Sequence, residues 1–105
     1  MELNNVRRVL CLGAHSDDIE IGCGGTVLRL LAARPDVSVR WVVFSADARR
    51  DAEARNSAAA FLQGAREKDV VVKNFRDGFF PQQGEPMKEF FETLKKDFAP
   101  DLVLT

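Results

Sequence analysis

The chain has no tyrosine, one histidine, one tryptophan and two cysteines in 105 residues. Two cysteines are too few for the disulfide framework of a small secreted domain, so we expect a reducing compartment, the cytoplasm. The formal net charge of −1 gives no electrostatic reason to expect nucleic acid or an anionic membrane as a partner. No apolar run approaches the roughly 20 residues of a membrane-spanning helix, and the first residues lack the basic-then-apolar order of a signal peptide.

The composition, 46% hydrophobic and 30% charged, fits one globular domain. Apolar runs typical of buried strands alternate with stretches of helical periodicity. The predicted strands cover residues 6–12, 38–44, 69–75 and 102–104, and the predicted helices cover 24–34, 48–62 and 86–98. This alternation predicts an α/β fold, a three-layer sandwich around a parallel sheet of strand order about 3-2-1-4. Right-handed crossovers then place the first two helices on one face and the third on the other.

In that order, one helix cannot cover a whole face of four strands, and the fourth strand is a bare apolar edge. We therefore expect residues 1–105 to be the single N-terminal portion of a larger domain, truncated after the fourth strand. An uncovered sheet face and a free edge also predict self-association, so a homo-oligomer is possible.

The segment 13–25, GAHSDDIEIGCGG, follows the first strand and holds the only histidine and two adjacent carboxylates. His15 and Asp18 are three residues apart, so an imidazole nitrogen and a carboxylate oxygen can meet on one divalent ion, and zinc accepts both. Asp17, between them, could act as a general base on a zinc-activated water. A solvated acidic turn with a locally hydrogen-bonded histidine is the alternative interpretation. Three glycines in the second half indicate a tight turn or a close backbone approach: Gly22, Gly24 and Gly25.

Residues 14–26 resemble the Ala-His-Pro-Asp-Asp…Gly-Cys-Gly-Gly-Thr signature of the PIG-L/LmbE-like N-acetylglucosaminyl deacetylases. Later similarities are weaker: Arg50-x-x-Glu53 in a helix, Asp77-Gly78 after the third strand, and residues 100–105. The resemblance implies a Rossmann-like fold. It also implies zinc-dependent hydrolysis of an N-acetyl group on an N-acetylglucosamine-type substrate, a small-molecule amino-sugar conjugate.

Carried over position by position, the resemblance makes His15 and Asp18 zinc ligands and Asp17 the catalytic base. It places three further residues on the substrate side: Arg50, Glu53 and Asp77. Two departures stand out. Ser16 replaces the proline of the signature, and the family's third zinc ligand, a later histidine, has no counterpart because the chain has one histidine.

Arg50, Glu53 and Asp77 also have interpretations that involve no substrate. Arg50 and Glu53 could belong to a solvated helix face with pairs such as Asp51 with Arg55, and Asp77 before glycine is typical of a turn. Nucleotide binding is disfavoured, because the glycine spacing is wrong and the two adjacent carboxylates would repel a pyrophosphate. Two alternatives remain: a receiver-like domain that binds Mg²⁺ and accepts a phosphoryl group on Asp77, and an inert folded fragment with weak metal affinity.

Overall fold

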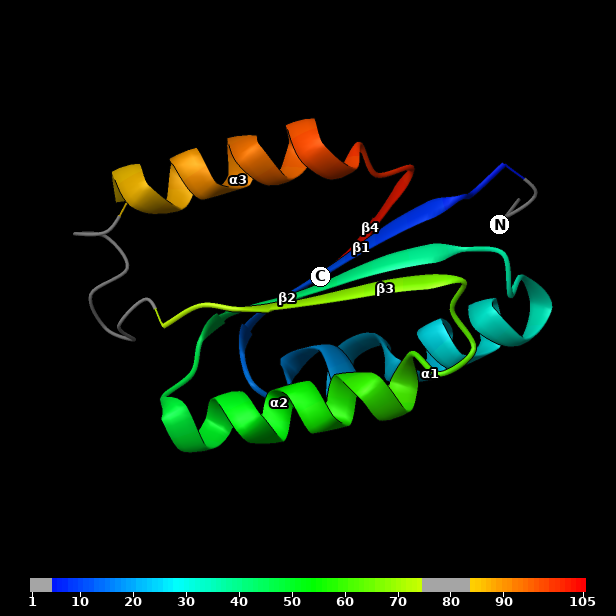
Figure 1. The fold of residues 1–105 in the computed structure, drawn as a ribbon, viewed down its shortest axis with the longest axis horizontal. Coiled ribbons are helices and arrows are strands. Elements are labelled where there is room, and N and C mark those ends of the chain that lie inside the picture. The colour runs from blue at the N-terminus through cyan, green and yellow to red at the C-terminus, as the bar shows by residue number, and fades with distance from the viewer. Residues whose placement is uncertain (1–4, 75–83) are drawn as a thin grey trace.

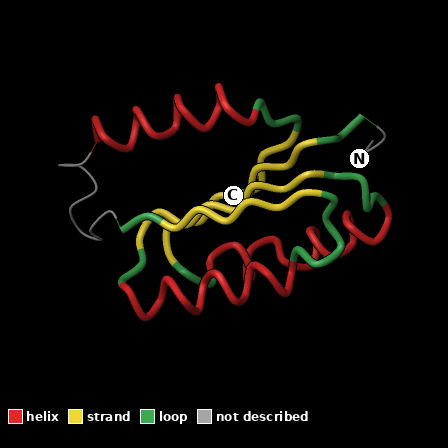
Figure 2. Tube along the Cα trace, viewed as in Figure 1, coloured by secondary structure: helices red, strands yellow, loops and turns green. Residues whose placement is uncertain are grey.

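A computed structural model describes residues 5–74 and 84–105. The elements in chain order are β1 (Arg8–His15), α1 (Asp18–Ala33), β2 (Ser38–Ser45), α2 (Ala48–Phe61), β3 (Glu67–Val72), α3 (Gly84–Phe98) and β4 (Leu102–Leu104). The four strands form one parallel sheet in the order β3-β2-β1-β4. Helices α1 and α2 cover one face and α3 lies across the other (Figure 1). The strand trace in Figure 2 shows the layers edge-on. The predicted fold class and strand order are therefore confirmed.

Each face of the sheet has its own core, because side chains alternate along a strand. On the α1/α2 face, the fully buried Trp41 packs at 5.9 Å, centroid to centroid, against the ring of Phe61 on α2. On the α3 face, Phe44 meets Phe90 edge-on at 5.7 Å, and Leu94 is buried in the same cluster. These two cores hold the three layers together.

The first helix begins earlier than the sequence predicted. It starts at Asp18 instead of residue 24, so the three glycines lie inside α1 and the tight-turn interpretation of them was wrong. The alternative, a close approach, holds at Gly24, where a Cβ would lie 2.7 Å from Cε1 of Phe61. The reason is burial: apolar side chains recur along α1 at helical spacing and offset the low helix propensity of glycine. The buried positions are Ile19, Cys23, Val27, Leu30 and Leu31.

Two strands, β1 and β3, have boundaries that differ from those predicted from the sequence. β1 runs to His15 instead of ending at residue 12, and β3 covers Glu67–Val72 instead of 69–75. Polar residues are accommodated in both strands because the ladder to β2 continues through them. The consequence for the site is that His15 is the last residue of a strand, and the turn before α1 is only two residues long.

Gly22 and Gly24 make a matched pair for testing why α1 contains glycine. A Cβ at residue 22 would meet nothing within 4 Å, whereas one at residue 24 would lie 2.7 Å from Cε1 of Phe61. We expect Gly22→Ala to stabilise the protein by about 0.5–1 kcal/mol through helix propensity. Gly24→Ala should destabilise it by about 1–3 kcal/mol because the ring must move. Urea denaturation measures the change in unfolding free energy of each variant. A change in the same direction for both would contradict the close packing of α1 against α2.

Asp101 joins the start of β4 to the start of β1. Its carboxylate accepts hydrogen bonds from the backbone N–H groups of Arg7 at 2.9 Å and Arg8 at 3.0 Å. These bonds favour the ionised form, first that from Arg7 and then that from Arg8, and hold the pKa of Asp101 below its usual 3.8.

A carboxyl group with a lowered folded pKa stabilises the protein above its unfolded pKa, and the contribution is lost as the pH falls through the folded value. We therefore expect Asp101→Asn to be less stable than the parent protein at pH 7. The two unfolding free energies should converge as the pH falls below 3.8. Denaturation measured from pH 7 to pH 2 tests this, and a difference independent of pH would contradict it.

Candidate functional site

The polar turn after β1 lies at the carboxyl edge of the parallel sheet. His15 ends β1 in register with Ser45, which ends β2, and α2 begins just beyond it (Figure 1). β1 is also where the strand order reverses, since β2 and β3 lie to one side and β4 to the other. Open α/β sheets bind ligands at the carboxyl ends of strands beside such a reversal. The fold thus places the histidine and its neighbouring carboxylates where a ligand site is expected.

The side chains of His15 and Asp18 converge. Oδ2 of Asp18 accepts the backbone N–H of His15 at 2.9 Å and lies 3.5 Å from Nδ1 of the same histidine. Both side chains remain nearly half exposed. The hydrogen bond to the strand backbone fixes the carboxylate beside the imidazole, so Nδ1 of His15 and Oδ2 of Asp18 are held together on partly exposed side chains.

Gly13 makes this approach possible. A Cβ built at residue 13 would lie 2.9 Å from Cγ1 of Ile19 and 3.2 Å from Cβ of Asp18. Both atoms belong to the first turn of α1, and real Cβ atoms essentially never sit under 3.0 Å from another heavy atom. Because Gly13 has no side chain, the first turn of α1 can pack directly against the end of β1.

Asp17 has an unusual conformation for a helix N-cap. Its φ of 77° and ψ of −17° are left-handed, and its side chain makes no capping hydrogen bond to the helix. Its carbonyl oxygen still accepts the N–H of Ile21 at 2.9 Å, which begins the helix. An aspartate at this position usually binds its carboxylate to the first-turn N–H groups. Here the exposed carboxylate of Asp17 is released from that role, at a backbone cost on the order of 1 kcal/mol.

The donor set fits part of a zinc site. Imidazole and carboxylate are zinc ligands, and a catalytic zinc usually takes three protein ligands and leaves one position for water or substrate. Across residues 5–74 and 84–105, no group of three histidine, cysteine or acidic side chains is close enough to hold a metal ion. Both cysteines are buried, and burial raises the pKa of the Cys11 thiol to about 12 and also raises that of Cys23.

The two predicted α2 residues lie at the same edge of the sheet, because α2 follows β2. Asp47 caps the helix by accepting the N–H of Arg50 at 2.9 Å, and the Arg50 side chain is exposed. Glu53 pairs with Arg49 one turn earlier, at 3.6 Å between Oε1 and Nε. The pair expected for a solvated helix face is present too, as Asp51 and Arg55 lie 2.6 Å apart. Asp77 lies outside the described residues.

Two further polar residues at this edge were not singled out in the sequence. Ser45 ends β2 opposite His15, and it forms an isolated bridge with Asn74, which follows β3. A hydroxyl and an amide thus continue the row of polar groups across three strand ends. The available signal was position, since each follows a run of apolar strand residues.

Comparison with known proteins agrees with the geometry of this edge. The family model "PIG-L: GlcNAc-PI de-N-acetylase" matches residues 10–105. The chain belongs to the PIG-L family. A curated relative of this PIG-L family chain is the diacetylchitobiose deacetylase of Thermococcus kodakarensis, 28% identical over 110 residues that cover 96% of the chain and 41% of the relative. The chain therefore spans less than half the length of that relative.

The family membership bears on the competing interpretations. The match begins within β1 and includes the whole segment 13–25, so the histidine and the two carboxylates lie inside the matched residues. Neither the receiver-like nor the nucleotide-binding interpretation receives support from these comparisons. Among the described helices of this PIG-L family member, none is long and apolar enough to cross a membrane.

Proposed function

We propose that the chain contributes the metal-binding and proton-transfer residues of a zinc-dependent N-deacetylase that acts on an N-acetylglucosamine-type small molecule. Membership of the PIG-L family supports the reaction class, and the named activity of the Thermococcus relative supports an N-acetylated amino sugar as substrate. The observation that carries the proposal is the convergence of His15 and Asp18 in a turn whose Asp17 carboxylate does not cap the helix.

In this proposal His15 and Asp18 hold the metal, and a third donor comes from outside the described residues. Zinc bound there would acidify a water molecule to a pKa of about 7 and polarise the acetamide carbonyl. The backbone hydrogen bond from His15 to Asp18 keeps the two donors at their spacing before the metal arrives. Such preorganisation reduces the ordering required on metal binding.

Asp17 is the proposed general base. Its carboxylate accepts a proton from the attacking water as the new C–O bond forms at the acetamide carbon. The same proton is then delivered to the nitrogen as the C–N bond breaks, which yields acetic acid and a free amine. The acid then gives its own proton to solvent or to the amine and becomes acetate. Asp17 is ionised at the end of the cycle as at its start, so atoms and charge balance.

Arg50, Glu53 and Asp77 are proposed to face the substrate. The first two lie in the opening turns of α2, at the edge that carries His15. A guanidinium and a carboxylate there suit the hydroxyl groups of a sugar, which both accept and donate hydrogen bonds. Asp77 keeps this role as a proposal from the resemblance alone.

The deciding assay uses the protein expressed from its natural reading frame, with whatever follows Thr105 included. N-acetylglucosamine, diacetylchitobiose and N-acetylglucosaminyl conjugates are offered, and released acetate and free amine are quantified. We expect hydrolysis of at least one of them, its loss after chelation, and its recovery with zinc. Full activity after verified metal removal would refute zinc dependence, and an alkali-labile phosphate on Asp77 after treatment with a small phosphodonor would support a receiver instead.

Residues 1–105 alone should bind zinc weakly, because two protein donors are one fewer than a catalytic zinc site provides. Equilibrium dialysis of this chain against zinc measures the affinity directly. Retention of one tightly bound zinc through extended dialysis would contradict the expectation and would show that two donors suffice or that a second copy supplies the third.

Self-association is proposed from the edge of the sheet. β4 is the outermost strand beside β1, and Val103 is 47% exposed. Unpaired edges with exposed apolar side chains favour pairing with another chain. Sedimentation velocity should show a concentration-dependent species larger than the 11.7 kDa chain. A monomer at every concentration would contradict this.

A further inference from the structure

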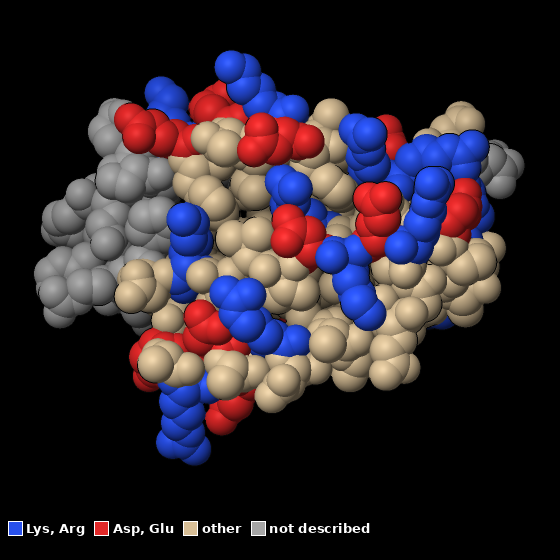
Figure 3. Space-filling view, in the orientation of Figure 1, with Lys and Arg blue, Asp and Glu red and all other residues tan. Residues whose placement is uncertain are grey.

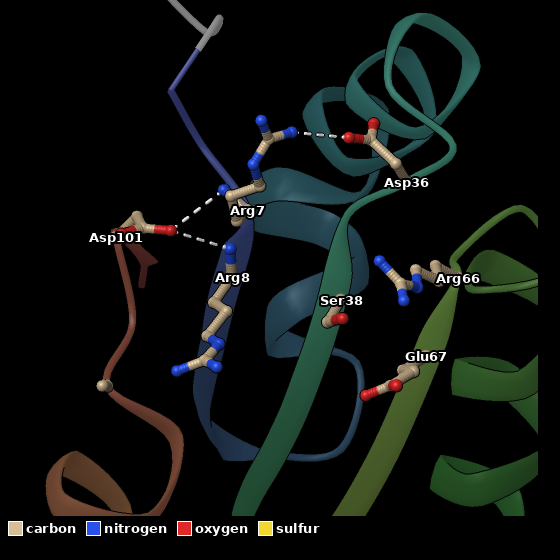
Figure 4. Close-up of a pocket in the computed structure, with 8 residues that line it drawn as sticks. Arg7, Arg8, Asp36, Ser38, Arg66, Glu67 and Asp101 are labelled. Atoms are coloured by element: carbon tan, nitrogen blue, oxygen red, sulfur yellow. Dashed lines mark hydrogen bonds and ion pairs between the residues drawn. The ribbon is translucent and has the colours of Figure 1, made fainter.

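A hollow of about 460 Å³ lies at the end of the sheet opposite the candidate active site. Its walls come from the starts of β1, β2 and β3 and from the turn between α3 and β4 (Figure 4). At this end of the molecule, side chains of both charges crowd together on the surface (Figure 3). The hollow is therefore a separate feature from His15 and its neighbours.

Two of the carboxylates around the hollow already have hydrogen-bond partners within the protein. Asp36 accepts from Nη1 of Arg7 at 2.8 Å and from two nitrogens of Arg34 at 3.1 Å each, so two guanidinium groups share one carboxylate. Asp101 accepts the two backbone N–H groups at the start of β1. These contacts hold the pKa values of both carboxyl groups below their usual range, which is consistent with filled partnerships.

Two arginines in the wall keep donors for a ligand. Arg8 donates Nη1 to the carbonyl of Phe98 at 3.1 Å, a neutral acceptor. Arg66 is exposed and forms no ion pair within residues 5–74 and 84–105, and Figure 4 shows its side chain extending from just before β3 toward Ser38 of β2. The remaining carboxylate in the wall is Glu67. The lining carries three arginines and three carboxylates, so its formal charges cancel, and Arg7 is already paired with Asp36.

We propose that this hollow binds the phosphate monoester of a small polyol, such as a sugar phosphate. The planar guanidinium of Arg66 presents paired N–H donors that match phosphate oxygens, and Arg8 adds a second positive group. Ser38 and Glu67 offer a hydroxyl and an acceptor for the ligand's hydroxyl groups. Glu67 also repels a phosphate from its own side, which orients the ligand with its phosphate toward Arg66. The volume lies within the roughly 300–1,000 Å³ of small-molecule sites, and the charged wall excludes an apolar ligand.

The test is a titration of the ¹⁵N-labelled chain with glucose 6-phosphate, with glucose and inorganic phosphate as separate probes. We expect saturable shifts confined to residues 7–8, 36–38, 66–67 and 99–101, with glucose 6-phosphate binding more tightly than phosphate and glucose not binding. Shifts centred on His15 or Asp17, or no saturation with glucose 6-phosphate, would overturn the proposal.

Variants separate a specific site from general attraction to positive charge. Arg66→Ala should weaken glucose 6-phosphate binding at least 5-fold, and Arg66→Lys should restore part of it, since lysine keeps the charge without the fork. Arg49→Ala is the matched control, because it removes one exposed arginine at the opposite edge of the sheet. Equal weakening by Arg66→Ala and Arg49→Ala would contradict a built site. Unchanged amide spectra of each free variant report that the fold is intact.

Discussion

Replacing Asp17 by asparagine should reduce N-deacetylation about 100- to 10,000-fold, the usual contribution of a general base. Asparagine has nearly the same shape and also tolerates the left-handed φ of 77°, so the turn and α1 should form as before. What is lost is the ability to accept a proton. Acetate release by the protein from its natural reading frame measures the rate, and thermal unfolding reports the fold.

Asp17→Gly is the control that separates proton transfer from backbone strain. Glycine adopts the left-handed conformation freely, so this variant should be as stable as the parent or more stable by up to about 1 kcal/mol. It should be no more active than Asp17→Asn. If either variant keeps the parental rate with zinc supplied, Asp17 is not the base.

Replacing Trp41 by alanine should destabilise the fold by about 3–5 kcal/mol, the range for removing a large aromatic side chain from a core. Trp41 has no exposed surface and fills the space between the sheet and α2, against Phe61. The loss is a large share of the roughly 5–15 kcal/mol that typically stabilises a domain. Urea denaturation followed by far-UV circular dichroism measures the change, because the only tryptophan is removed.

Trp41→Phe tests a second property of the same residue. Nε1 of Trp41 is buried and has no hydrogen-bond partner within the described part of the chain. A buried unsatisfied N–H costs about 1–3 kcal/mol, and phenylalanine removes that group while keeping most of the apolar volume. The two effects offset, so we expect this variant within about 1.5 kcal/mol of the parent. A loss as large as that of Trp41→Ala would indicate that the indole N–H is satisfied.

The sequence was sufficient to predict the architecture, because the alternation of apolar strands and periodic helices is strong. Residues 38–44 and 102–104 lie in strands as predicted, and the order 3-2-1-4 follows from right-handed crossovers. The start of α1 was not predictable from glycine content. Local propensity predicted a helix only from residue 24, but burial of Ile19 and Cys23 stabilises the helix from Asp18 onward, through Gly22.

For the candidate site, the sequence identified the residue types and their spacing, and the structure supplied what spacing cannot. That Asp18 binds the backbone of His15, and that Asp17 adopts a left-handed φ without capping, are conformational facts with no signature in composition. The sequence likewise gave no indication of the charged hollow at the other end of the sheet. Its walls come from strands and turns up to 94 residues apart in the chain, as the bond between Arg7 and Asp101 illustrates.

Gly13 limits which side chains can be introduced beside this site. Because even one methyl group there would collide with Ile19 and Asp18, residue 13 sets how far the helix must stand from the strand. If the proposed zinc site forms, Gly13→Ala should weaken zinc affinity, as equilibrium dialysis would report, although residue 13 itself offers no ligand atom. The spacing between the donor atoms of His15 and Asp18 thus depends on the absence of a side chain at Gly13, two residues before His15.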